Sequence, residues 1–454
     1  MPTIVTLSIL TISLNVVLSA KILGLFPPPV NSHRNLYVPL VQELVQRGHD
    51  VTVISPYAET PDSKNGSLRS IVLTGFVEWM RGNLVPRYHK VQFPILDGMK
   101  NMRTFEQTDT NVFQKLQTSI AFLEKMTEMT LEHKEVQKLI HSKETFDVVI
   151  ITEVLNHALK ALAPHFKAPL VSFSTVGACS LSNLLVGNPS PPSYVPDIFS
   201  DYSSQMTFLE RLTNSLTHLY TQVCFNWYVY PKHNKLMTKY IPGEYDFDRV
   251  IHNISIVLLN SHPSINQPVP LVPNMIEIGG FHIKPPKQLP QDLQEYLDNA
   301  PNGVIYFSMG SNLKSAELPM EKRDAFLKTF AKLKQKVIWK WEEDVLPGKP
   351  DNVKLGKWLP QSSILGTCQF IFPPLERQVL AHPNIRLFIT HGGLLSTTET
   401  VYHGVPVLAI PIFGDQKQNA QIAVNLGFGL SLSFEDVNEE ALTRTIVELL
   451  NNPK

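Results

Sequence analysis

The sequence predicts an α/β protein made of two doubly wound halves, and three observations support that fold class. Apolar runs of strand length alternate with helical repeats near the N-terminus and again after Gly303. Between them, the stretch from His262 to Pro290 holds seven prolines, two adjacent glycines and no periodicity, which is typical of a linker. The length of 454 residues suits two or three domains. We expect an N-terminal domain over 21–265, a linker over 266–290 and a C-terminal domain over 291–454.

The N-terminal half opens with a strand, a helix and a second strand. Ile22–Phe26 has the apolar character of a buried strand and is followed by Pro27–Pro29. Leucines then recur at helical spacing until Gly48, a suitable C-cap, and Val51–Ser55 is the next strand. The same pattern predicts a strand, a helix and a strand over 146–151, 154–166 and 170–174. The segments 56–140 and 175–250 have no pattern that identifies a ligand; the first suits a variable binding region.

The C-terminal half alternates more tightly. Five strands are expected at Val304–Ser308, Val337–Trp341, Val353–Leu355, Leu387–Thr390 and Val405–Ile410. Three helices are expected near 320–335, 394–402 and 416–426. Ligands of such folds bind where the carboxyl ends of parallel strands meet, so the cleft between the halves is the expected site.

Composition excludes several classes of protein. The 40 basic and 40 acidic residues leave no net charge, which argues against a partner held by long-range electrostatics, such as nucleic acid. The three cysteines, Cys179, Cys224 and Cys368, lie far apart and form no CxxC pair. A disulfide scaffold and a structural zinc site are therefore both excluded, and no metal site is expected.

The two ends of the chain differ. Residues 2–20 are uncharged and apolar and end in small residues, so residues 1–20 are expected to be a signal peptide, with a buried strand or an uncleaved anchor as alternatives. Two glycosylation acceptor sequences, at Asn65 and Asn253, agree with entry into the secretory pathway. Glu435–Lys454 reads as an amphipathic helix, and no second apolar run of about 20 residues suggests a membrane span.

A glycine-rich turn in the C-terminal half suggests an anion site. The strand Leu387–Thr390 runs into His391-Gly392-Gly393, and a helix follows. Glycines let the backbone approach a phosphate closely, and a helix N-terminus favours negative charge. His391 and Ser396 would donate to phosphate oxygens, and Glu399 would accept from ribose hydroxyls. The alternative is that Ser396 and Glu399 form a capping box that binds nothing.

Three further segments point to a nucleotide sugar. Ser311 follows Gly310 in a second turn after the strand 304–308. Trp358 offers an indole on which a base could stack, with the amide of Gln361 nearby. Asp415 and Gln416 are a carboxylate and an amide, which suit sugar hydroxyls. Taken singly, Trp358 would be a core residue and Asp415 a helix N-cap.

Together these segments resemble the nucleotide-sugar signature of the UDP-glycosyltransferases, in particular the animal branch. The matching stretch runs from Trp358 to Asn419, and it includes the runs 390–399 and 402–406 and the pair Asp415-Gln416. The resemblance implies the GT-B fold, two Rossmann-like domains facing a cleft. The C-terminal domain would bind the UDP-sugar and the N-terminal domain a small acceptor. The implied chemistry is inverting transfer without a metal or other cofactor.

The resemblance also assigns roles. Trp358 would stack on uracil and Gln361 would lie along the uridine. Ser311, His391, Gly393 and Ser396 would hold the diphosphate, Glu399 the ribose, and Asp415 with Gln416 the sugar. The family base is a histidine after the first strand, which here is His33, since a neutral imidazole suits proton removal near pH 7. Most histidines lie at the surface, and a surface loop is the alternative for His33.

The family often supports this base with a carboxylate after the strand that here starts at Phe146. Glu153 is the expected partner of His33, although the local sequence Ile151-Thr152-Glu153 matches the family pattern imperfectly. Asp147 begins the strand and is better interpreted as structural.

Two features depart from the family. Residues 366–377 form an extra segment, well beyond the roughly 4–6 residues of a typical connection, and it is either a surface loop or an error in the sequence. Family members also continue into a transmembrane anchor, which this chain is expected to lack.

The expected function is transfer of a hexose, glucose or glucuronic acid, from a UDP-sugar to a hydroxyl of a small lipophilic acceptor in the lumen of the endoplasmic reticulum. Detoxification is the expected context. The alternative is a weak or inactive homologue that only binds a lipophilic ligand or a nucleotide.

Overall fold

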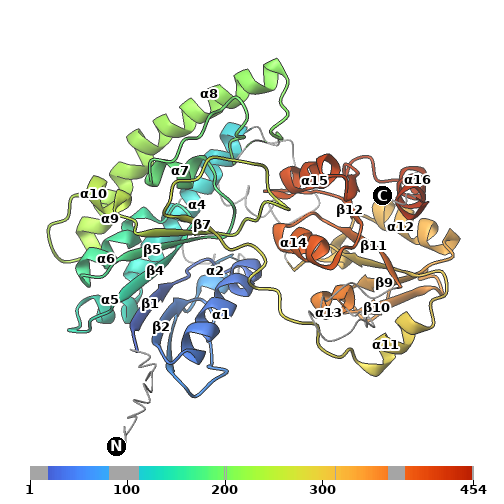
Figure 1. Cartoon of the computed structure of the whole chain (residues 1–454), viewed down its shortest axis with the longest axis horizontal. Helices are drawn as coiled ribbons and strands as arrows, with labels where there is room; N and C mark the ends of the chain where they lie inside the picture. The colour runs from blue at the N-terminus through green and yellow to red at the C-terminus, as the bar shows by residue number, and fades with distance from the viewer. Residues whose placement is uncertain are drawn as a thin grey trace, which may run out of the picture.

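Two parallel β-sheets flanked by helices lie side by side in this computed structural model, which describes residues 19–80, 112–198, 200, 202–311, 313–366 and 384–451 (Figure 1). The first sheet belongs to the N-terminal part of the chain and the second to the C-terminal part. The predicted fold class, α/β with two doubly wound halves, is confirmed.

Within the described residues the first sheet has seven parallel strands in the order β3-β2-β1-β4-β5-β6-β7. The strands are β1 (Lys21–Leu25), β2 (Asp50–Ser55), β3 (Ser67–Val72), β4 (Val148–Glu153), β5 (Leu170–Ser174), β6 (Ile256–Leu259) and β7 (Met275–Glu277). Leu23 and Leu25 pack on one face and Ile22 on the other, so β1 is buried on both faces after the exposed Lys21. The strand order reverses between β1 and β4, and ligand crevices form at such points.

Helix α1 (Asn31–Gln46) connects β1 to β2. Tyr37, Val41 and Val45 recur every fourth residue and are buried against the sheet. The helix ends just before Gly48, whose φ of 91° suits glycine. The other helices of this half are α2 (Phe76–Met80), α4 (Val112–Glu132), α5 (Lys134–Ile140), the 3₁₀ turn η1 (His157–Ala161), α6 (Leu162–His165), α7 (Ser180–Leu185), α8 (Phe208–Cys224), the π-helical turn η2 (Phe225–Val229), α9 (Tyr230–Tyr240) and α10 (Phe247–His252).

The second sheet, as far as the chain is described, has six parallel strands in the order β10-β9-β8-β11-β12-β13. They are β8 (Val304–Ser308), β9 (Lys336–Lys340), β10 (Val353–Gly356), β11 (Ile385–Thr390), β12 (Val407–Ala409) and β13 (Gly429–Ser431). Relabelled from one to six, this is the order 3-2-1-4-5-6 of nucleotide-binding folds. The helices are α11 (Gln291–Asp298), the 3₁₀ turn η3 (Ser315–Glu317), α12 (Met320–Lys332), α13 (Gln361–Gly366), α14 (Leu394–His403), α15 (Gln416–Asn425) and α16 (Glu439–Asn451).

Two expectations about the N-terminal half need correction. The predicted linker 266–290 contains β7, which pairs with β6, so the connection between the sheets begins only after Glu277. The predicted helix 154–166 is broken into η1 and the single turn α6. Its start is displaced because Leu155 has a positive φ of 57°, which no helix accommodates.

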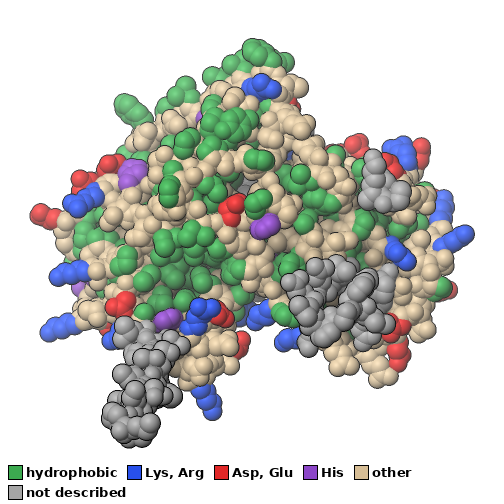
Figure 2. All heavy atoms as spheres, viewed as in Figure 1, with side chains coloured by type: hydrophobic (Ala, Val, Ile, Leu, Met, Phe, Trp, Pro, Cys, Tyr) green, Lys and Arg blue, Asp and Glu red, His purple; other side chains and the backbone are tan. Residues whose placement is uncertain are grey.

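Helix α8 was not predicted, because its polarity is inverted. Its buried side chains are polar and include Asn214, Thr217 and His218, while Phe208 and Leu209 are more than two-thirds exposed. Hydrophobic side chains gather along this helix at the top of the view in Figure 2. Asn214 explains the inward polar face, since its amide donates to the carbonyls of Pro192 and Val195 and accepts from the N–H of Asp197.

Several sequence-based expectations fall partly or wholly outside the described residues. The signal peptide 1–20 is described only at its last two residues, and the extra segment 366–377 only at Gly366. Asn65 and Asn253 are both exposed, as a glycosylation acceptor must be. None of the described helices combines the length and the apolar character that a membrane crossing needs.

Candidate active site

A cleft of about 900 Å³ lies where the carboxyl ends of the two sheets face each other. His33 lines it from the N-terminal half, while Ser311, Trp358, Gln361, His391, Gly393, Ser396, Glu399, Asp415 and Gln416 line it from the C-terminal half. The structure thus brings together every predicted site residue except Glu153 and the two glycosylation sites.

The turn after β11 has the features of an anion site. Gly392 has a φ of 77°, and α14 begins at Leu394 with Gly393 as its N-cap and no side-chain cap. Ser396 is therefore inside the helix, so the capping-box interpretation of Ser396 and Glu399 is wrong. The N-terminus of α14 lines the cleft, and the carboxyl group of Asp415 accepts from the N–H of Leu394 there.

The imidazole of His391 is fixed between two glycines. A Cβ added at Gly310 would lie 2.5 Å from Cε1 of His391, and one added at Gly393 would lie 2.6 Å from its Nε2. The Oγ1 of Thr390 lies 3.3 Å from Nδ1. Burial, together with the charge of Lys340, lowers the pKa of His391 to about 4. The ring is therefore neutral near pH 7 and has one N–H to donate.

Gln361 links three residues of the C-terminal half of the cleft. Its Nε2 donates to Oε2 of Glu399 at 2.7 Å and lies 3.2 Å from Oγ of Ser396, and its Oε1 lies 3.4 Å from the hydroxyl of Tyr306. Burial raises the pKa of Glu399 to about 7. Gln361 thus orients the carboxyl group that was predicted to hold the ribose.

Asp415 and Gln416 are held by the turn that precedes α15. The Oδ2 of Asp415 accepts from the amide of Asn419 at 2.8 Å, and burial raises the pKa of this carboxyl. Asp415 occupies the N-cap position but forms no side-chain cap, so N-capping does not explain its side chain. The Oε1 of Gln416 accepts from the backbone N–H groups of Ile412 and Phe413, which fixes the amide at the edge of the cleft.

Trp358 is not a core residue. Its side chain is 75% exposed, and it lines the cleft at the start of the turn before α13. An indole this exposed is free to stack on a planar ligand.

Replacement of Trp358 by alanine is expected to weaken UDP binding by roughly 5- to 150-fold, because stacking of a base on an aromatic ring is worth about 1–3 kcal/mol. The free energy of unfolding should change by less than about 0.5 kcal/mol, since the side chain is exposed. Titration calorimetry with UDP measures the first quantity and denaturant unfolding the second. Trp227→Ala is the control, because Trp227 is 83% exposed and lies outside the cleft. Equal UDP affinities of the two variants would contradict the stacking role.

His33 lies in the first turn of α1, directly after the triple-proline loop. Its Nε2 lies 3.2 Å from Oγ1 of Thr175, which follows β5 and also lines the cleft. Its Nδ1 is enclosed and has no hydrogen-bond partner among the described residues. Burial lowers the pKa of His33 to about 4, so the ring is neutral at pH 7.

The expectation that Glu153 supports His33 is wrong. Ser172 donates to Oε2 of Glu153 at 2.8 Å, and Nζ of Lys160 lies at the same distance from this atom. The carboxylate and the ammonium group are both buried, with 7% and 0% of their side chains exposed. Glu153 therefore neutralises a buried lysine of η1 and forms no hydrogen bond to the imidazole.

The family model described as "UDP-glucoronosyl and UDP-glucosyl transferase" matches residues 25–454. The chain belongs to this family. UDP-glycosyltransferase UGT5 of Dactylopius coccus is 35% identical to it, over 98% of this chain and 79% of that protein. UDP-glucuronosyltransferase 2B33 of Macaca mulatta is 29% identical, over 91% of this chain and 75% of that protein.

Solved glycosyltransferases have the same fold. The glycosyltransferase VinC in complex with DTDP has a TM-score of 0.58 at 15% identity, and the match covers 95% of this chain and 92% of that one. A UDP-glucosyltransferase from Polygonum tinctorium has a TM-score of 0.56 at 16% identity, and the match covers 95% of this chain and 90% of that one. The architecture is GT-B, and this member of the UDP-glycosyltransferase family is a glycosyltransferase.

Sequence reasoning missed several residues of the glycosyltransferase cleft, and four of them carry polar groups next to the predicted site. They are Arg34, Thr175, Tyr306 and Lys340. Thr175 directly follows the predicted strand 170–174, so its place at a carboxyl end could have identified it. Lys340 ends β9 in the same way, and its Nζ lies 2.7 Å from Oε1 of Glu342. Across the part of the chain that the structure describes, no group of three potential metal ligands occurs.

Proposed function

We propose that this protein transfers glucose or glucuronic acid from a UDP-sugar to a hydroxyl group of a small lipophilic acceptor, with inversion at the anomeric carbon and with His33 as the general base. The observation that carries the proposal is the position of His33 across one cleft from the residues of the donor side. A base opposite the donor phosphates is placed to activate an attacking hydroxyl from the face away from the leaving group.

In this mechanism the acceptor oxygen forms a bond to the anomeric carbon while the bond from that carbon to the diphosphate oxygen breaks. The hydroxyl proton passes to Nε2 of His33, and UDP leaves. His391 and the N–H groups at the start of α14 hold the diphosphate and stabilise its developing charge. Trp358 stacks on the uracil, Glu399 binds the ribose, and Asp415 and Gln416 bind the sugar. Ser311 and Ser396 add hydroxyl groups to the phosphate site. Gly393 has no side chain, so the protein backbone can approach the phosphates closely there.

A second candidate function has one observation in its favour. The Nδ1 of His33 has no carboxylate partner in the described chain, and the lowered pKa makes the imidazole a weak base. A homologue that binds a lipophilic ligand or a nucleotide with little or no transfer would have such a site.

Release of UDP with a panel of phenolic acceptors distinguishes the two functions. We expect acceptor-dependent UDP release with UDP-glucose or with UDP-glucuronic acid, and a product of inverted configuration by NMR. Chelation of metals by EDTA should leave the rate unchanged, because the proposed chemistry uses no metal or other cofactor. If acceptors bind but neither donor yields UDP, the binding function is correct.

We further propose that the chain acts in the lumen of the endoplasmic reticulum as a glycoprotein that conjugates lipophilic compounds, as in detoxification. The apolar run 2–20 and the exposure of Asn65 and Asn253 support this location. Expression in a secretory cell should give a protein whose mass falls on treatment with N-glycosidase, and an unchanged mass would contradict glycosylation.

A further inference from the structure

The first turn of α1, which carries His33, has few anchors of its own. Its N-cap is Val30, which offers no side-chain acceptor, and the turn contains no acidic residue. The preceding Pro27–Pro29 loop has no N–H groups to donate. The N–H of Arg34 donates to the carbonyl of Val30 at 3.1 Å, which is the first backbone bond of the helix. Backbone bonding alone therefore leaves the position of the first turn weakly defined.

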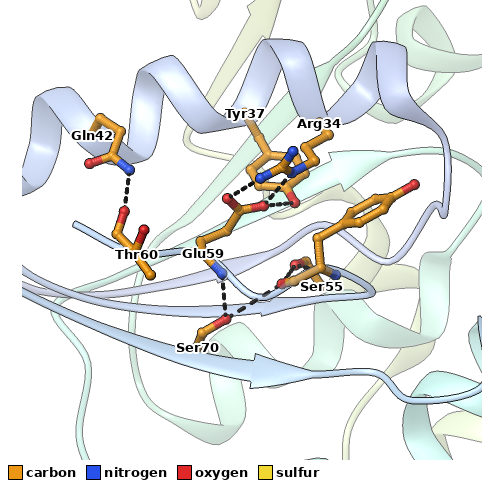
Figure 3. Close-up of polar contacts among 8 residues, drawn as sticks. Arg34, Tyr37, Gln42, Ser55, Glu59, Thr60 and Ser70 are labelled. Atoms are coloured by element: carbon orange, nitrogen blue, oxygen red, sulfur yellow. Dashed lines mark hydrogen bonds and ion pairs between the residues drawn. The ribbon is translucent and has the colours of Figure 1, made fainter. Parts of the chain in front are cut away.

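Arg34 ties this turn to the loop between β2 and β3 (Figure 3). Its Nε donates to Oε1 of Glu59 at 2.8 Å, and its Nη2 donates to Oε2 at 2.9 Å. Such a two-point contact fixes the orientation of the guanidinium as well as its distance. The guanidinium also lies over the ring of Tyr57, 5.3 Å from the centroid.

Glu59 is itself held rigidly. Its side chain is only 4% exposed, and its Oε1 accepts a second bond from the hydroxyl of Tyr37 at 2.9 Å (Figure 3). The N–H of Glu59 donates to Oγ of Ser70, which lies on β3. The loop, the sheet edge and the helix are therefore joined through one buried carboxylate. The positive charge of Arg34 is paired with Glu59 inside this cluster, although Arg34 also lines the cleft.

A second ion pair on the same helix is a typical exposed surface contact and serves as a comparison. Near the end of α1, Nε of Arg47 lies 2.7 Å from Oε1 of Glu43, and the two side chains are 68% and 54% exposed. Exposed pairs of this kind contribute little to stability or geometry. The contrast with the buried carboxylate of Glu59 indicates that the Arg34–Glu59 ion pair fixes the first turn of α1 in particular, and not the helix as a whole.

We propose that Arg34 and Glu59 are positioning residues for His33. By fixing the first turn of α1, they hold the imidazole with Nε2 beside Thr175 at the wall of the cleft. The proposal rests on the role of His33 as base given above. A displacement of about 1 Å at a reacting group can cost roughly 100-fold in rate, so loss of the tie should appear in kcat. Donor binding should not change, because the donor residues lie in the other half of the molecule.

The test uses Glu59→Gln, with Glu43→Gln as the matched control on the same helix. We expect Glu59→Gln to lower kcat by about 10- to 100-fold, with the KM for the UDP-sugar within about twofold of the parent. The control should keep the parent kcat. Arg34→Lys, which keeps the charge and loses the two-point contact, should give an intermediate kcat. A kcat loss fully explained by the unfolded fraction at the assay temperature, measured by circular dichroism, would overturn the proposal.

Combination with His33→Ala separates this inference from the proposed mechanism. If Glu59 acts through His33, then His33→Ala and His33→Ala/Glu59→Gln should transfer sugar at equal residual rates. A further loss in the double variant would overturn the positioning role. If His33→Ala is as fast as the parent, the proposed base is wrong. If His33→Ala is slow while Glu59→Gln is as fast as the parent, only the positioning role fails.

Discussion

Replacement of His33 by alanine is expected to lower kcat by about 10²- to 10⁴-fold, the range that a general base contributes. The affinity for UDP should stay within about twofold of the parent, because the donor residues belong to the other half of the cleft. UDP release measures the first quantity and calorimetric titration with UDP the second. His141→Ala is the control, since His141 is an exposed histidine outside the cleft. A variant that turns over as fast as the parent would exclude His33 as the base.

The pH dependence gives a second check of the same residue. Burial lowers the pKa of His33 to about 4 from a usual value near 6.5. The ring therefore stays unprotonated between pH 7 and pH 5, and kcat at saturating UDP-sugar, where Glu399 is engaged with the donor, should show no acidic limb centred near 6.5. Because the folded-state pKa is the lower one, the burial of neutral His33 costs stability as the pH falls from about 6.5 to about 4. An acidic limb centred near 6.5 would show that the imidazole is solvated or paired with a carboxylate.

Replacement of Glu153 by glutamine is expected to destabilise the N-terminal half by about 3–5 kcal/mol, because it leaves the ammonium group of Lys160 buried without a counter-charge. Burial already lowers the pKa of Lys160, and Glu153 opposes that shift. Denaturant unfolding measures the loss. The kcat of the folded fraction should be unchanged, because Glu153 forms no hydrogen bond to the base.

A double variant supplies the control for this expectation. Glu153→Gln/Lys160→Met removes both charges, and most of the stability should return. A stable Glu153→Gln variant with a kcat reduced by 100-fold or more would contradict the structural role. It would restore the carboxylate–histidine pair that the sequence suggested.

The donor half could be predicted in detail because its signals are local. The strand at Val304–Ser308 has the predicted bounds, and the turn His391-Gly392-Gly393 leads into α14 as expected. Each of these signals lies within about ten residues of sequence, where hydrophobic period and glycine position determine the backbone. Trp358 was recognised only through its neighbours, since an isolated tryptophan is more often buried.

The pairing of Glu153 with Lys160 instead of with His33 could not be predicted, because it depends on a turn. Leu155, with its positive φ, redirects the chain after β4. The 3₁₀ turn that follows brings Lys160 back to Glu153, which the sequence placed beside His33. Helix α8 could not be predicted for a related reason. Its inward-facing Asn214 donates hydrogen bonds to carbonyl groups of a loop some twenty residues earlier. Hydrophobic periodicity has no information about such partners.

The ring of His391 fills the space that a Cβ at either Gly310 or Gly393 would need. These three positions consequently form one steric unit, and no single replacement at a glycine is neutral while the imidazole remains. A smaller residue at 391 would relieve the clash, but it would also remove the N–H that we propose donates to the diphosphate. Gly310 adds its own restriction, because its φ of 80° disfavours any side chain. Single substitutions at this turn are therefore unfavourable. If the proposed roles hold, donor preference is more readily altered by substitution of Trp358 or Gln416.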